Sequence, residues 1–166
     1  LAAIERGRAV GQVLQVPHLQ VAHAAAAVDT AQPHPLAGAI VLLGASPRHR
    51  HLFIGDLDWA VLPPIALKQF RLFAKDGRPL AYACWAFVSD EVDSRLKTGQ
   101  IKLKPNEWKS GENCWLIDIV APLGRAAAFT KLLTDNVLKD ETVRLSAAVQ
   151  FAVKSEAARA GSAAKQ

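Results

Sequence analysis

Residues 114–121 read CWLIDIVA, an almost wholly apolar run that Pro122 ends. A run of this kind predicts a strand that is buried on both faces, near the centre of a sheet. Asp118 interrupts it with a carboxylate. Counting alternate positions puts the Asp118 side chain on the same face as Leu116 and Val120. A buried carboxylate is costly unless it is paired, so Asp118 is either a hydrogen-bonded structural residue or a functional one.

The segments around this strand predict a mixture of helices and strands. The sequence Asp76-Gly77-Arg78-Pro79 is a tight-turn signal that indicates a hairpin. Ser89, followed by two acidic residues, predicts the start of a short helix that runs to Lys97. The other expected elements are helices over 36–45, 52–62 and 125–138 and strands over 70–74, 80–88 and 142–151. This order predicts an α/β (α+β) fold with helices flanking a small, mostly antiparallel sheet.

The length of 166 residues suits one domain with a sizeable core. We expect residues 1–35 to form an N-terminal arm, residues 36–151 to form the main domain, and residues 152–166 to form a C-terminal helix or tail. Residues 98–113 are polar and read as a long surface loop. No apolar run approaches the roughly 18 residues that a membrane-spanning helix needs.

Charge and cysteine content restrict the function classes. The net charge of +5 favours acidic partners, but the basic residues are scattered, which argues against nucleic-acid binding. Cys84 and Cys114 are too few for a disulfide framework. We expect two reduced, buried thiols, with one cross-strand disulfide as the alternative. No His/Cys spacing resembles a metal site.

A second candidate residue lies in the segment Ser46-Pro47-Arg48-His49-Arg50. Ser46 is a good helix N-cap, and Pro47 suits the first helical position. His49 would then lie in the first turn, where the positive end of the helix disfavours imidazolium. That would favour a neutral ring able to act as a base. The alternative is a solvent-facing histidine among arginines.

Five segments, in this order, carry a family resemblance. They are Ser46-Pro47-Arg48-His49-Arg50, Val61-Leu62-Pro63 with Ile65, Ala81-Tyr82-Ala83-Cys84-Trp85-Ala86, Trp108 with Ser110-Gly111, and Trp115-Leu116-Ile117-Asp118-Ile119-Val120-Ala121-Pro122-Leu123-Gly124. Together they resemble the RTX toxin-activating lysine-acyltransferase family, of the hemolysin-activating protein C type. The resemblance covers about residues 36–150. It has one departure, Ala60, where family members commonly have Asn.

The resemblance implies a fold like that of the Gcn5-related N-acetyltransferases. It also implies transfer of a fatty acyl group from acyl-acyl carrier protein to internal lysines of an RTX protoxin. The family's essential residues fall on His49 and Asp118. The histidine would act as a general base or as an acyl-carrying nucleophile, and the carboxylate would orient it. The residues expected to bind substrate are Ser46, Arg50, Tyr82 and Trp85.

The expected partners are therefore acyl carrier protein and an RTX protoxin, with a possible homodimer and no nucleic acid. We expect no permanently bound cofactor and no metal, and a location in the cytoplasm of a Gram-negative bacterium. Two other functions remain open: an acetyl-CoA-dependent N-acetyltransferase and a non-catalytic protoxin-binding module. Coenzyme A enzymes of this fold usually hold pyrophosphate in a Gly-rich turn at a helix N-terminus. The segment Pro122-Leu123-Gly124-Arg125 has a single Gly, which favours a carrier-borne donor.

Overall fold

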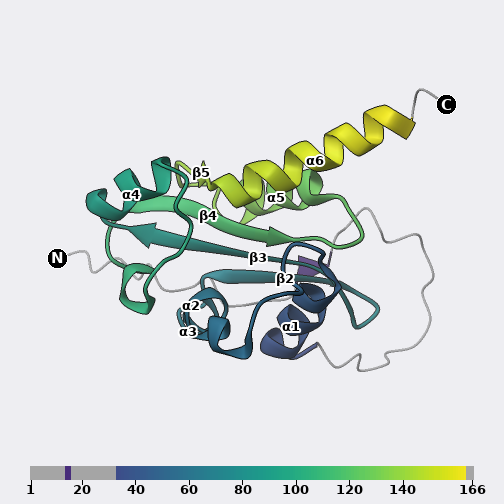
Figure 1. The fold of residues 1–166 in the computed structure, drawn as a ribbon, viewed down its shortest axis with the longest axis horizontal. Helices are drawn as coiled ribbons and strands as arrows, with labels where there is room; N and C mark the ends of the chain where they lie inside the picture. The colour runs from purple at the N-terminus through teal and green to yellow at the C-terminus, as the bar shows by residue number, and fades with distance from the viewer. Residues whose placement is uncertain (1–13, 16–32, 164–166) are drawn as a thin grey trace.

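The computed structural model describes residues 14–15 and 33–163 (Figure 1). In this part of the chain a five-stranded sheet has the order β1-β2-β3-β4-β5. Its strands are β1 (Leu14–Gln15), β2 (Phe70–Lys75), β3 (Arg78–Val88), β4 (Asn113–Val120) and β5 (Arg144–Leu145). The long strands β2, β3 and β4 run antiparallel to one another, and the short outer strands β1 and β5 pair in parallel with β2 and β4. The expected mostly antiparallel sheet is confirmed.

Helices cover both faces of the sheet (Figure 1). On one face lie α1 (Pro35–Ala45), α2 (Leu57–Ala60) and α3 (Leu62–Ala66), and on the other lie α5 (Ala126–Asn136) and α6 (Ala147–Ala163). Each face buries its own hydrophobic cluster, because side chains of interior strands alternate between the two sides. This layering is consistent with the expected Gcn5-related acetyltransferase-like fold.

The hairpin between β2 and β3 forms as predicted. Lys75 pairs with Arg78, so Asp76 and Gly77 make a two-residue turn, with φ values of 51° and 71°. Positive φ at both positions is the geometry that matches the twist of a hairpin. The next helix, α4 (Asp90–Lys97), also begins where it was expected, because the Ser89 hydroxyl accepts from the backbone N–H at the third position beyond it.

The prediction of a strand over 142–151 is wrong except at residues 144–145. Only Arg144–Leu145 pair with β4, and α6 then begins. The Ser146 hydroxyl marks the change, since it accepts from Val149 N and donates to the backbone oxygen of Ile117. The alanine-rich sequence that follows favours a helix. This helix crosses residue 152 without a break.

The helix expected over 52–62 is divided into three short pieces, η2 (Ile54–Asp56), α2 and α3. Pro63 and Pro64 were expected beyond a helix end, but they lie in the first turn of α3. A proline is tolerated there because the first turn has N–H groups without helical partners.

The loop expected over 98–113 is anchored to the sheet. It contains η3 (Pro105–Glu107), and Leu103 and Trp108 within it are buried. The N–H groups of Ser110 and Gly111 donate to the Phe87 oxygen at 2.8 and 3.1 Å. At Gly111 an added Cβ would lie 2.5 Å from the backbone oxygen of Val88, so the close approach depends on glycine.

Cys84 and Cys114 are both free and buried, which confirms the thiol interpretation. Burial raises the pKa of the Cys114 thiol to about 12, and it raises the pKa of Cys84 well above its usual range. Neither thiol is therefore an activated nucleophile. Within the described residues, none of the helices has both the length and the apolar character that a membrane crossing requires.

Candidate functional site

An irregularity in β4 determines which face of the sheet the Asp118 side chain shares with its neighbours. The pairing with β3 passes from Cys84↔Asp118 to Trp85↔Leu116, so Ile117 has no partner. Such an extra residue is a β-bulge, and it re-aims the side chains beside it. Ile117 and Asp118 consequently line the same cavity, whereas Leu116 belongs to the cluster on the other face. The prediction that Asp118 shares a face with Leu116 was wrong, because the bulge interrupts the alternation.

The turn after α1 brings Ser46 and His49 to this cavity. The prediction that a helix begins at Ser46 was wrong. Ser46 instead ends α1, with an extended ψ of 122° that is typical of a residue before proline. The N–H groups of His49 and Arg50 bond to the Ser46 oxygen at 3.0 and 2.9 Å and close a turn. The argument from a helix N-terminus therefore does not apply to His49.

His49 links Ser46 to Asp118 through its two ring nitrogens. Nε2 lies 2.7 Å from Asp118 Oδ2, and Nδ1 lies 2.8 Å from Ser46 Oγ. Both Ser46 and His49 are buried. A carboxylate can only accept, so Nε2 donates to it. A neutral His49 ring then presents its lone pair at Nδ1, where the Ser46 hydroxyl donates to it.

Arg48 is the site residue that the sequence analysis missed. Its Nη2 donates to Asp118 Oδ1 at 2.5 Å and to the Ile119 oxygen at 3.1 Å, and Nη1 donates to the Ala148 oxygen at 2.8 Å. The available signal was the carboxylate itself, since a carboxylate in an apolar strand needs a cation nearby. Arg50, which was expected to bind substrate, is exposed and lines a separate pocket together with His49.

The electrostatics keep Asp118 ionised. Burial alone would raise the pKa of its carboxyl group. The hydrogen bond and charge of His49 and the charge and hydrogen bond of Arg48 oppose burial and hold that pKa below its usual range. At neutral pH the group is therefore a carboxylate that orients the imidazole.

This lowered pKa predicts a pH dependence of stability. An unfolded Asp has a pKa of about 3.9, so ionised Asp118 stabilises the fold fully above that pH, and the contribution is lost as pH falls through the folded pKa. We expect the difference in unfolding free energy between wild type and Asp118→Asn to shrink as pH falls from about 6 to about 3. Urea denaturation across that series measures it. A difference that stays constant would contradict the ionised state.

Tyr82 and Trp85 were both expected at the site, and the structure separates them. Tyr82 lines the cavity beside Asp118, and its buried hydroxyl makes no hydrogen bond of ordinary geometry. Burial, with the neighbouring Cys84 thiol and Asp118 charge, raises the Tyr82 pKa well above its usual range, so the hydroxyl stays protonated. Trp85 lies in the hydrophobic cluster on the other face of the sheet.

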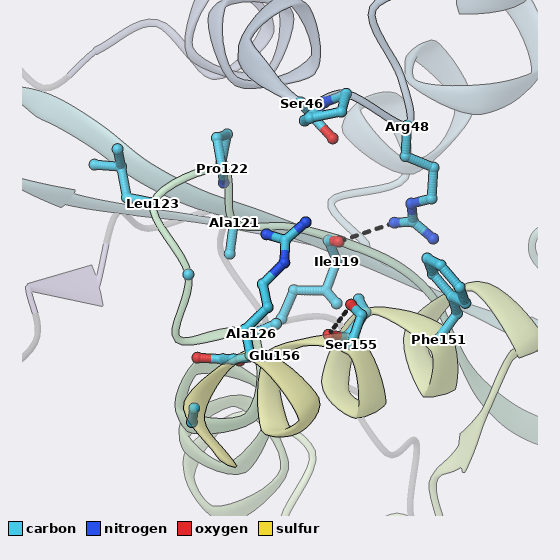
Figure 2. Close-up of a pocket in the computed structure, with 15 residues that line it drawn as sticks. Ser46, Arg48, Ile119, Ala121, Pro122, Leu123, Ala126, Phe151, Ser155 and Glu156 are labelled. Atoms are coloured by element: carbon cyan, nitrogen blue, oxygen red, sulfur yellow. Dashed lines mark hydrogen bonds between the residues drawn. The ribbon is translucent and has the colours of Figure 1, made fainter. Parts of the chain in front are cut away.

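Two hollows flank these residues. The larger, which we name the cleft, has a volume of about 590 Å³ and lies between Ser46–Arg48, the β4–α5 connection and α6. Figure 2 shows Ser46 and Arg48 opposite Phe151, Ser155 and Glu156 of α6. The smaller, which we name the apolar cavity, has a volume of about 180 Å³. It is lined by Arg48, His49 and Asp118 and by mostly apolar residues, among them Trp59, Ala60, Val61, Ile101, Trp108 and Ile117.

The N-terminus of α5 is occupied by a side chain of the protein itself. The Glu156 carboxylate, from α6, accepts from the N–H groups of Arg125 and Ala127. These are the groups with which a helix N-terminus would bind an anion. Among the described residues, no cluster of His, Cys, Asp and Glu is arranged to hold a metal ion.

Comparison with known proteins places this chain in a family. Residues 29–157 match the profile of the RTX toxin acyltransferase family. The chain belongs to that family. It is therefore an acyltransferase, and both the Ser46–Arg50 turn and the bulged strand β4 lie inside the matched range.

Individual relatives agree with the family match. The lysine-acyltransferase RtxC of Vibrio cholerae is 32% identical over 108 residues, which cover 64% of this chain and 71% of that protein. An uncharacterized protein, sll0720, of Synechocystis is 33% identical over 107 residues, covering 63% and 73%. The protein-lysine myristoyltransferase HlyC of Escherichia coli is 34% identical over 92 residues, covering 55% and 53%. The alignment thus spans about half the length of HlyC.

Proposed function

We propose that this protein transfers a fatty acyl group from a carrier-borne thioester to internal lysines of an RTX protoxin, with His49 as the base. The observation that carries the proposal is the hydrogen-bonded chain Ser46–His49–Asp118 at the edge of the cleft. Family membership supports the protoxin as acceptor. The names of RtxC and HlyC support lysine as the acceptor side chain and a fatty acyl group as the cargo.

The transfer requires a deprotonated amine. Free lysine has a pKa of about 10.4, so it is protonated near neutral pH. The lysine ammonium first loses one proton to solvent. As the neutral amine nitrogen then attacks the thioester carbon, a second proton passes to Ser46 Oγ, and the hydroxyl proton passes to His49 Nδ1. Asp118 stabilises the resulting imidazolium. The C–S bond then breaks, and the departing thiolate receives the proton back by the same route.

The alternative role for His49 is that of a nucleophile that carries the acyl group. Nucleophilic attack needs a ring nitrogen with an open lone pair. Ser46 covers Nδ1 and Asp118 covers Nε2. This occupation supports the role of base over that of nucleophile.

The proposed donor is an acyl group on the pantetheine arm of a carrier protein. Coenzyme A carries a pyrophosphate that enzymes of this fold bind at a helix N-terminus. Here Glu156 already uses those N–H groups, and its negative charge would repel a pyrophosphate. The arm of a carrier protein lacks that group, and a net charge of +5 favours an acidic carrier.

The test is an acylation assay with defined partners. The protein is mixed with a protoxin fragment and with either myristoyl-acyl carrier protein or myristoyl-coenzyme A. We expect a mass gain of one myristoyl group on lysine with the carrier-borne donor. Equal turnover with the two donors would reject the carrier protein as the donor and leave the acyl-transfer proposal in place. No lysine acylation with either donor, given a verified protoxin fragment, would reject the whole proposal.

The same assay tests the base. We expect His49→Ala to reduce lysine acylation by about a thousandfold or more, because a positioned general base contributes about 10²–10⁴ in rate. His51→Ala is the matched control, since His51 lies exposed in the same turn and should retain full activity. Circular dichroism checks that both variants fold. Equal activity of the two variants would remove His49 from the mechanism.

A further inference from the structure

Arg48 stands between the two hollows. Of the described residues that line them, it alone lines both the cleft and the apolar cavity. Its guanidinium bonds to the Ile119 oxygen on the cleft side and to the Ala148 oxygen on the cavity side. Figure 2 shows the bond between Arg48 and the Ile119 oxygen. The side chain therefore bridges β4 and the start of α6.

Several hydrogen bonds hold Arg48 in this position between the cleft and the apolar cavity. Its two terminal nitrogens donate to the Asp118 carboxylate and to both backbone oxygens. Moving the guanidinium away would break its ion pair with Asp118 and its two bonds to backbone oxygens, which is costly. An alkyl chain cannot replace such bonds. A chain that enters from the cleft therefore meets a fixed, charged wall.

The apolar cavity, on the other side of Arg48 from the cleft, is suited to a hydrocarbon chain. Its lining is mostly aliphatic and aromatic, and Arg48 and His49 in it are both hydrogen-bonded to Asp118. Ala60 contributes only a methyl group there, at the position where the family commonly has Asn. A fatty acyl chain whose thioester lay beside His49 would gain from this cavity if the wall were open.

We propose that Arg48 sets the acyl-chain preference of this enzyme by closing the route from the cleft to the apolar cavity. This inference rests on the proposed acyl-transfer function. In the wild type the far end of a long chain stays outside the cavity, over the exposed side chains of Leu123 and Phe151 at the cleft. Removing the guanidinium joins the two hollows and admits longer chains.

The direct test measures binding, so it does not depend on turnover. The probes are S-alkyl pantetheines with octyl, dodecyl and hexadecyl chains, titrated by calorimetry. Each methylene that becomes buried strengthens binding about fourfold. We expect Arg48→Ala to increase the hexadecyl-to-octyl affinity ratio at least about tenfold over wild type. An unchanged ratio in a folded variant would overturn the proposal.

A second variant tests the wall while Arg48 is in place. Ala60→Phe fills the cavity from its lining, so it should leave the chain preference of the wild type unchanged and should cancel the gain in the Arg48→Ala background. Weaker hexadecyl binding in Ala60→Phe alone would overturn the proposal, even if Arg48→Ala failed to fold. The acylation assay on the wild type tests the proposed function, whereas the binding measurements test the role of Arg48. Failure of one proposal is therefore distinguishable from failure of the other.

Discussion

Replacing Asp118 with Asn should lower the rate of lysine acylation by about 10⁴ and leave the fold intact. Arg48 donates to Oδ1, so the new amide keeps its oxygen toward Arg48 and turns its NH₂ toward His49 Nε2. Nε2 must then accept, which moves the ring proton to Nδ1. A protonated Nδ1 cannot take a proton from Ser46, so the base is lost while the packing survives.

The measurement is single-turnover acylation followed by mass spectrometry, alongside thermal unfolding. Asp93→Asn is the matched control, because Asp93 is a buried carboxylate outside the site, whose partners are Trp115, Lys97 and Arg144. It should lower stability and spare the chemical step. A rate for Asp118→Asn within tenfold of wild type would show that the tautomer of His49 is not set by Asp118.

Gly111→Ala should destabilise the fold by about 3 kcal/mol. The new Cβ would approach the Val88 oxygen to 2.5 Å and the Ser89 nitrogen to 2.7 Å, and both are backbone atoms that cannot rotate away. Residues 108–111 would have to leave β3, which also displaces Trp108 from the wall of the apolar cavity. Urea denaturation measures the free energy of unfolding.

Gly44→Ala provides the matched control for that substitution. An added Cβ at Gly44 meets nothing within 4 Å, and the residue lies in α1. The same chemical change there should stabilise the protein by about 0.5 kcal/mol, because alanine favours a helix and restricts the unfolded chain. If Gly111→Ala proved as mild as Gly44→Ala, residues 108–111 would not be held by close backbone contact.

Much of the fold was predictable from local signals. The Asp76-Gly77 turn and the Ser89 cap depend only on interactions between residues a few positions apart, so the local sequence is enough to predict them. The strand over 142–151 failed because its apolar residues fit either a strand or a helix. The choice was made by Ser146, whose hydroxyl bonds to the distant Ile117 oxygen.

The site was predictable in its chemistry but not in its geometry. His49 and Asp118 could be singled out as residues that break local patterns, and the structure brings them within 2.7 Å of each other. The bulge at Ile117 shows only in the pairing with β3. Arg48 was missed because its three acceptors come from β4 and α6, which no spacing in the sequence connects to the turn after α1.

The contacts of Arg48 also make catalytic activity depend on complete folding of the chain. Its partners Asp118 and Ala148 lie 70 and 100 residues further along the chain. Contacts of such sequence separation form late, after the loops between them have closed. During refolding, catalytic competence should thus return with the slowest kinetic phase. Peptides cut from any one region of the chain would carry no part of the reaction.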